Sequence, residues 1–312
     1  MAQSPHVLIF PFPVQGHINC MLKLAELLCC SGLHVTFLNS HHIHERLLCC
    51  TDIHQHFNQY PTFHFETISD GLPADHPRTG DRVVELFRSI NTITKPEFRD
   101  ILIGLHNPDG RPPVTCIIAD GIMSFTVDVA KELKIPTILF RTVSASCFWA
   151  FLSVTKLLEA GELPLNGESN RDRLLSNMPG LESFRLRDLP SFCRTSNLSD
   201  SGFQVVISET LQNLKADGLL LNTCEEIEGP ALSYIRELMP NLYTVGPLHA
   251  HLKSRAGSNP AQQRTSSSSL WTEDRSCMTW LDRKPHKNQN VCILSVVSIA
   301  MSKARQPYSS DS

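Results

Sequence analysis

The sequence predicts an α/β fold with a Rossmann-like, doubly wound parallel sheet. Two observations lead to this prediction: short, almost wholly apolar segments recur along the chain, and segments with apolar residues at helical spacing separate them. Strands that are apolar on both faces are typical of a parallel sheet covered by helices on each side. The composition agrees, because 41% of the 312 residues are hydrophobic and 19% are charged, as in globular proteins.

Seven segments have the apolar, β-rich character of buried strands. They are residues 6–11, 33–38, 62–67, 114–119, 136–140, 217–222 and 241–246. The spacing of apolar residues predicts helices between and after these strands. The predicted helices are residues 17–30, 122–133, 143–158, 203–214 and 225–238. Together these elements predict one domain over residues 1–250.

The character of the sequence changes after residue 250. Residues 251–271 are rich in Ser, Gly and Gln, which predicts a flexible linker. Residues 272–312 hold a short helical segment, one apolar run at 290–300 and a polar end. Because one strand cannot make a domain, we expect residues 272–312 to be the beginning of a second domain that is largely missing.

Charge and cysteine content argue against several classes of protein. The net charge is −3 and no Lys/Arg cluster is interleaved with aromatic residues, so nucleic acid is not an expected partner. No run of about 18 apolar residues offers a membrane span, and the first residues lack the regions of a signal peptide. The 11 cysteines are odd in number and scattered, so we expect reduced thiols and a cytoplasmic location.

Gly16 and His17 stand where the first predicted strand turns into a helix. In an open parallel sheet, ligands bind beyond the carboxyl ends of the strands, at the point where the strand order reverses. With the common order 3-2-1-4-5, His17 faces Asp120, which ends the fourth strand, across this crevice. A carboxylate bonded to one ring nitrogen fixes the tautomer and leaves the other nitrogen as a base. Gly16 leaves room for a ligand to approach the backbone.

Each of these residues also has a purely structural interpretation. A histidine near a helix start is often solvated or a cap, and an Asp after a strand is often the N-cap of the next helix. The chain has no G-x-G-x-x-G, Walker or G-x-S-x-G motif, so dehydrogenase, kinase and esterase functions have no local support. The His- and Cys-rich residues 41–56 match no usual zinc spacing, and we expect a solvated helix there.

Consecutive segments of the chain resemble the plant family-1 UDP-glycosyltransferases in order and spacing. They include "HVLIFPFPVQGHINCMLKLAELL", "CIIADGIMSFTVDVAKELKIPTILFRTVSA", "LLLNTCEEIEGPAL" and "SCMTWLDRKP". Within the family, the segments are similar to the branch of 7-deoxyloganetic acid and 7-deoxyloganetin glucosyltransferases. The resemblance implies a GT-B fold, of which residues 1–250 would be the N-terminal, acceptor-binding domain. It also implies inverting transfer, in which an acceptor hydroxyl is deprotonated and attacks the anomeric carbon of a UDP-sugar.

The resemblance also implies roles for individual residues. By position, His17 matches the catalytic base, Asp120 its orienting partner, and Thr142 a residue that contacts the donor sugar. Phe148, on the helix after the fifth strand, either lines an apolar acceptor site or packs in the core. No metal or cofactor is expected, because the UDP-sugar, expected to be UDP-glucose, is a co-substrate. The expected acceptor is a small lipophilic plant molecule such as an iridoid, a terpenoid or a flavonoid.

The sequence departs from the family after "WLDRKPHK". In this family the UDP-sugar is held mainly by the C-terminal domain, through a signature that includes His-x-Gly-Trp-Asn-Ser, and this signature is absent. We therefore expect poor donor binding and little or no transfer by this chain. A frameshift, a retained intron or a faulty gene model near residue 288 is the preferred explanation. The alternative function is a non-catalytic acceptor-binding or interaction module derived from such an enzyme.

Overall fold

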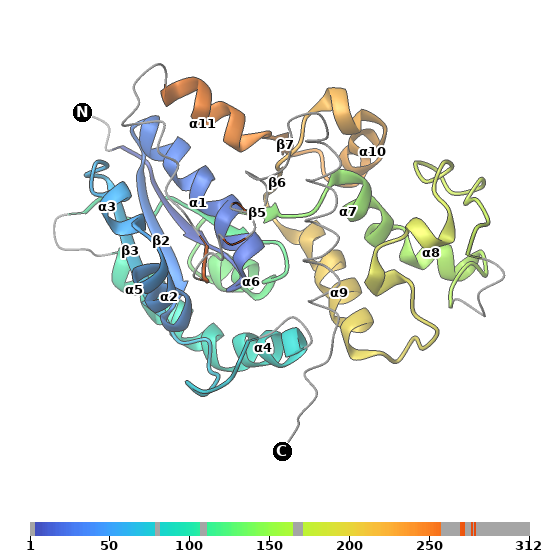
Figure 1. The fold of residues 1–312 in the computed structure, drawn as a ribbon, viewed down its shortest axis with the longest axis horizontal. Helices are drawn as coiled ribbons and strands as arrows, with labels where there is room; N and C mark the ends of the chain where they lie inside the picture. The colour runs from blue at the N-terminus through green and yellow to red at the C-terminus, as the bar shows by residue number, and fades with distance from the viewer. Residues whose placement is uncertain are drawn as a thin grey trace. The chain divides into compact units, whose positions relative to one another are not determined.

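The computed structural model describes residues 4–78, 82–106, 111–164, 171–256 and 269–271, together with residues 276 and 278. The chain divides into two compact units, Met1–Leu270 and Trp271–Ser312. The first unit holds the helices and strands that are labelled in Figure 1. The predicted apolar strand at 290–300 lies outside the described residues.

Seven strands in the described part of the chain form one sheet, in the order β3-β2-β1-β4-β5-β6-β7. Their bounds are β1 His6–Phe10, β2 His34–Ser40, β3 Phe63–Ile68, β4 Cys116–Asp120, β5 Thr137–Arg141, β6 Gly218–Leu221 and β7 Leu242–Thr244. Every neighbouring pair is parallel. The strand order reverses between β1 and β4, which confirms the predicted doubly wound parallel sheet and places the crevice where the sequence predicted it.

Helices cover both faces of the sheet (Figure 1). On one face lie α1 Gln15–Cys30, α2 His41–Cys50, α3 Ile53–Phe57 and α11 Leu248–Ala256. On the other lie α4 Val83–Ser89, α5 Lys95–His106, α6 Phe125–Glu132, α7 Ala145–Leu152, α8 Val154–Glu159, α9 Ser201–Gln212 and α10 Glu225–Leu238. A π-helical turn at Ile90–Thr94 joins α4 to α5, and short 3-10 turns occur at Leu186–Asp188, Ser191–Cys193 and Asn213–Lys215.

Alternating strand side chains build the two cores. On β1, Val7 and Ile9 join the cluster that contains α1, whereas Leu8 and Phe10 join the cluster on the opposite face. Successive side chains of a strand point to opposite faces, so a strand covered on both sides is apolar throughout. All five residues of β1 are buried, which explains the continuous apolar run at the start of the sequence.

The observed elements differ from the predicted ones in three places. The predicted helix at 143–158 is two helices, because α7 ends at Leu152 and α8 begins at Val154. Residues 82–106, for which no element was predicted, contain α4, the π-helical turn and α5. Residues 251–256 of the predicted flexible linker belong to α11, and Leu270 near its other end is buried in the core. Residues 257–268 lie outside the described residues.

Candidate active site

His17 and Asp120 meet at the carboxyl edge of the sheet. His17 is in the first turn of α1, directly after β1, and Asp120 is the last residue of β4. Because β1 and β4 are neighbours, their ends bring the two side chains together, with His17 Nδ1 2.5 Å from Asp120 Oδ2. The imidazole keeps 22% of its surface exposed, whereas the carboxylate keeps 1%. A ligand can therefore reach the ring but not the carboxylate.

Backbone hydrogen bonds hold Asp120 in its orientation. Its Oδ2 also accepts a hydrogen bond from the N–H of Phe12 at 3.3 Å, and its Oδ1 accepts from the N–H of Ile122 at 3.2 Å. An ionised carboxylate only accepts hydrogen bonds, so it selects the tautomer of His17 that carries the proton on Nδ1. Nε2 then has a free lone pair and can remove a proton from a hydroxyl group.

The other predicted site residues differ in their placement. Thr142, which follows β5, places its Oγ1 3.2 Å from His17 Nδ1 and 3.4 Å from Nε2. Gly16 is exposed, and no atom lies within 4 Å of the position that a Cβ would take there. Phe148 is fully buried beneath the guanidinium of Arg141 and is not part of the cavity lining beside His17. The structure thus brings Thr142 to His17 and leaves Phe148 in the core.

A cavity of about 190 Å³ lies beside His17. Most of its lining is apolar and includes Phe12, Val14, Val84, Phe87, Val143 and Val206. The polar side chains in the lining are those of His17, Arg141, Thr142 and Glu209. An apolar pocket with a few convergent polar groups is the usual form of a small-molecule site. Sequence reasoning found His17 and Thr142 but missed the walls contributed by α4 and α9.

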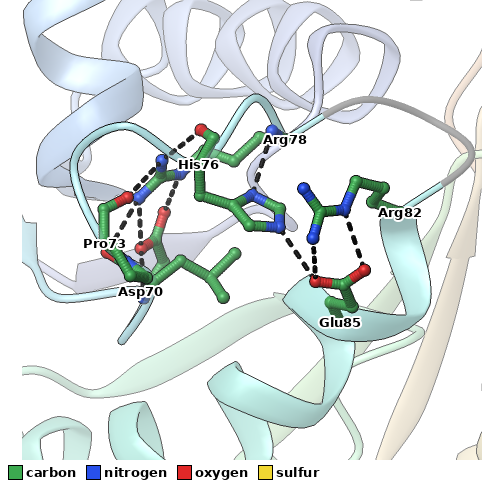
Figure 2. Close-up of polar contacts among 7 residues, drawn as sticks. Asp70, Pro73, His76, Arg78, Arg82 and Glu85 are labelled. Atoms are coloured by element: carbon green, nitrogen blue, oxygen red, sulfur yellow. Dashed lines mark hydrogen bonds and ion pairs between the residues drawn. The ribbon is translucent and has the colours of Figure 1, made fainter.

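The wall from α4 is fixed by the polar loop that precedes it (Figure 2). Arg78 donates two hydrogen bonds to Asp70, of 2.8 and 3.0 Å, and both side chains are buried. The ring of His76 accepts from the N–H of Arg78 through Nδ1, so Nε2 carries the proton and donates to Glu85 at 3.2 Å. Arg82 donates to both oxygens of Glu85. This network ties the loop to the first turn of α4, which supplies Val84 to the cavity.

Two charged side chains of the cavity lining are buried. Arg141 is 3% exposed and Glu209 is 6% exposed. Burial raises the pKa of Glu209, against the opposing effect of the Ser124 N–H that donates to its Oε2 at 2.9 Å. Burial lowers the pKa of Arg141, and the nearby Asp120 carboxylate is the strongest opposing charge. The one sequence signal for Arg141 is a cation at the end of the otherwise uncharged strand "TILFR".

The histidine-rich segment 41–56 forms α2, α3 and the turn between them. The rings of His44 and His54 lie 5.1 Å apart, and both pack against Phe65 of β3. In the described residues, no group of three or more His, Cys, Asp or Glu side chains is arranged to hold a metal ion. None of the described helices combines the length and apolar character needed to cross a bilayer.

Comparison with known proteins places these features in a family. A family model described as the N-terminal domain of glycosyltransferases matches residues 3–250. The 7-deoxyloganetic acid glucosyltransferase of Catharanthus roseus is 46% identical over 288 residues, which are 91% of this chain and 60% of that protein. The 7-deoxyloganetin glucosyltransferase of Gardenia jasminoides is 38% identical over 293 residues, again 91% of this chain and 60% of the relative. The chain thus spans about three fifths of the length of these relatives.

Solved structures show the same architecture. A UDP-glucose: anthocyanidin 3-O-glucosyltransferase in complex with UDP matches with a TM-score of 0.64 at 21% identity, over 91% of this chain and 59% of that one. The parallel sheet is therefore the N-terminal domain of a GT-B fold, as the sequence resemblance implied. With the family match over residues 3–250 and these relatives, the chain belongs to the plant UDP-glycosyltransferases.

Proposed function

We propose that the protein transfers a sugar from a UDP-sugar, with UDP-glucose as the expected donor, to a hydroxyl group of a small apolar plant metabolite. The observation that carries the proposal is the His17–Asp120 pair beside a mainly apolar cavity of about 190 Å³. Both relatives described above are named as glucosyltransferases, which supports glucose as the sugar. An iridoid is the first acceptor class to test, and terpenoids and flavonoids follow.

The geometry supports an inverting displacement. The acceptor hydroxyl occupies the cavity and donates its hydrogen to Nε2 of His17, while Asp120 holds Nδ1 and stabilises the imidazolium that forms. As the acceptor oxygen bonds to the anomeric carbon, the bond from that carbon to the diphosphate oxygen breaks and UDP leaves. The proton ends on His17. Thr142, whose Oγ1 lies 3.2 Å from Nδ1 of the same ring, is the residue we propose to contact the donor sugar.

Acceptor binding without transfer is the second candidate function. It is favoured by the origin of the cavity, because all the residues that line it come from positions 12–209 of this chain. Acceptor recognition thus needs only the N-terminal domain, whereas transfer also needs the donor to be held. We further propose a cytoplasmic location, which is supported by the cysteines of the described residues, all of which are free thiols.

The test is a transfer assay with two proteins. One is the 312-residue chain, and the other is a chimaera in which the remaining C-terminal part of the Catharanthus roseus relative follows this chain's N-terminal domain. Each is incubated with UDP-glucose and a pool of iridoid, terpenoid and flavonoid acceptors, and hexose addition is measured by mass spectrometry. We expect product from the chimaera, at least a hundredfold less from its His17→Ala variant, and little or none from the 312-residue chain.

The outcomes separate the two functions. Loss of the general base typically reduces the rate by about 100- to 10,000-fold. A folded chimaera that forms no product with any acceptor, or a His17→Ala chimaera that retains full activity, contradicts the proposed transfer by this site. Acceptor binding by the 312-residue chain without transfer by the chimaera favours the second function.

A further inference from the structure

Arg141 is a buried cation without a partner in the described part of the chain. It is the last residue of β5, and only 3% of its surface is exposed. Its Nε is buried and unbonded, and the guanidinium forms no hydrogen bond or ion pair with any described residue. A guanidinium has five N–H donors, and burying a charge without a partner is strongly unfavourable. The unpaired guanidinium therefore indicates that the protein binds an anion at this position.

Packing holds the guanidinium at the cavity. The ring of Phe148 lies 5.1 Å from the guanidinium carbon of Arg141. A Cβ added to Gly121 would clash with Cδ of Arg141, so the missing side chain at Gly121 makes room for the arginine stem. Arg141 and the adjacent Thr142 line the same cavity as His17. The cation is thus fixed beside the proposed base by contacts that do not involve an anion.

The carboxylates of Asp120 and Glu209 attract Arg141, but neither forms a hydrogen bond or ion pair with its guanidinium. Both oxygens of Asp120 already accept hydrogen bonds, from His17 and from backbone N–H groups. Glu209 accepts from the N–H of Ser124 at 2.9 Å, and it forms no hydrogen bond or ion pair with Arg141. The Oδ1 of Asn213 is also buried and unbonded beside Gly121. That oxygen can take at most two of the five N–H groups, so most of the guanidinium remains available.

The cavity lining offers one permanent cation to a ligand. Arg141 is the only Lys or Arg among the residues that line it in the described structure, and the remaining lining is mainly apolar. A diphosphate would bring at least two negative charges into this lining and find no second permanent cation. A carboxylate carries one charge and matches the planar fork of the guanidinium through two parallel hydrogen bonds.

We propose that Arg141 binds a carboxylate group of the acceptor while the acceptor's hydroxyl group faces His17. The proposal rests on the proposed function, since it assigns the acceptor to the cavity beside the base. It defines the acceptor as a small hydroxy acid with an apolar skeleton. Arg141 is then a specificity-determining residue, which binds the acid and discriminates against its neutral ester.

The first experiment measures binding, so it does not depend on transfer. 7-Deoxyloganetic acid and its methyl ester are titrated separately into the 312-residue chain by isothermal titration calorimetry. We expect the acid to bind about tenfold more tightly than the ester, as a charge-assisted pair in a buried site would produce. Equal affinity of the unmodified chain for acid and ester overturns the proposal without any variant.

Substitutions then assign the difference to Arg141. In Arg141→Gln we expect the affinity for the acid to fall about tenfold and the affinity for the ester to stay within about threefold. Arg185→Gln, at an exposed position outside the cavity, is the matched control and should leave both affinities unchanged. Equal losses for acid and ester would mean that Arg141 only supports the fold or Asp120. If Arg141→Gln does not fold by circular dichroism, Arg141→Lys, which keeps the charge but not the fork, replaces it.

Two further measurements distinguish carboxylate binding by Arg141 from donor binding and from the proposed transfer reaction. UDP is titrated into the same proteins, and a selective loss of UDP binding in Arg141→Gln with an unchanged acid-to-ester ratio would assign the cation to the donor instead. In the chimaera, Arg141→Gln should lower the rate with the acid and spare the rate with the ester. If the chimaera glucosylates neither compound while the acid still binds through Arg141, the proposed transfer fails and the carboxylate site stands.

Discussion

Asp120 orients the ring of His17 through a hydrogen bond and also supplies a negative charge. Asp120→Asn removes the charge and nearly keeps the shape of the side chain. In Asp120→Asn the side-chain oxygen can still accept from Ile122 at the place of Oδ1, and the amide N–H₂ then takes the place of Oδ2 and faces His17. The ring must then accept at Nδ1 and carry its proton on Nε2, which removes the base. We expect the transfer rate of the chimaera to fall by about 100- to 10,000-fold.

The control for this prediction is an aspartate outside the site. Asp128→Asn, at an exposed position of α6, should keep the full rate. Steady-state kinetics measure both variants, and thermal unfolding shows whether Asp120→Asn remains folded. A folded Asp120→Asn protein with the unmodified rate would mean that the carboxylate positions no proton, and that the short contact with His17 is only structural.

Glu228 lies in α10 but caps the N-terminus of another helix, α7. Its two oxygens accept hydrogen bonds from the N–H groups of Ala145 and Ser146, each at 2.9 Å, at the start of α7. Carboxylates are favoured at helix N-termini, where these N–H groups have no partner within the helix. α7 carries Phe148, on which Arg141 rests, so this cap also supports the cavity.

The cap predicts a pH dependence of stability. Burial would raise the pKa of Glu228, but hydrogen bonds from Ser146, Ala145 and Thr223 outweigh it and hold the pKa below its ordinary value of 4.5. A carboxyl with a depressed pKa stabilises the fold above pH 4.5, and this stabilisation is lost as the pH falls through the folded-state pKa. Glu228→Gln should lower the free energy of unfolding by about 1 kcal/mol at pH 7 and reduce its decline below pH 4.5.

Denaturant unfolding at several pH values measures this effect. Glu226→Gln, an exposed neighbour on α10, is the matched control and should change the free energy of unfolding by less than about 0.5 kcal/mol. If Glu228→Gln unfolds at the same denaturant concentration as the unmodified chain at every pH, the carboxylate does not cap α7.

The elements that the sequence predicted well are those with a strong local pattern. The strands are mostly apolar because helices cover both faces, so the apolar runs locate them within two residues. The pair of His17 and Asp120 followed from topology alone, because the carboxyl ends of β1 and β4 must meet. At these positions the local sequence pattern and the topology of the sheet predict the same structure.

Other features depend on tertiary contacts that leave no local pattern. The bond from Glu228 to the start of α7 joins residues more than 80 positions apart. Phe148 is apolar on a helix beside the site, and only packing decides that it supports Arg141 instead of facing a ligand. The cavity wall from α4 depends on the network around Arg78, whose partners are spread over the loop and the helix. Such contacts become visible only once the chain is folded.

The sheet separates the unit into two hydrophobic cores, which differ in the parts of the chain that build them. The helices that cover one core, α4 to α10, follow one another along the chain. The core on the side of α1 also takes Leu248 of α11 and Leu270, which come from the far end of the unit. Leu270, which lies where the sequence composition predicted a flexible linker, therefore packs in the same core as the first helix of the chain.

Leu270 tests whether this packing stabilises the unit. It is 1% exposed, its N–H donates to the side chain of Gln15, and its carbonyl accepts from Arg46. Truncating a buried leucine removes its burial and leaves a cavity, so Leu270→Ala should lower the free energy of unfolding by about 2–4 kcal/mol. Leu48→Ala, on an exposed position of α2, is the matched control and should cost less than about 1 kcal/mol. Urea unfolding followed by circular dichroism measures both, and equal costs for the two variants would mean that the burial of Leu270 does not stabilise the unit.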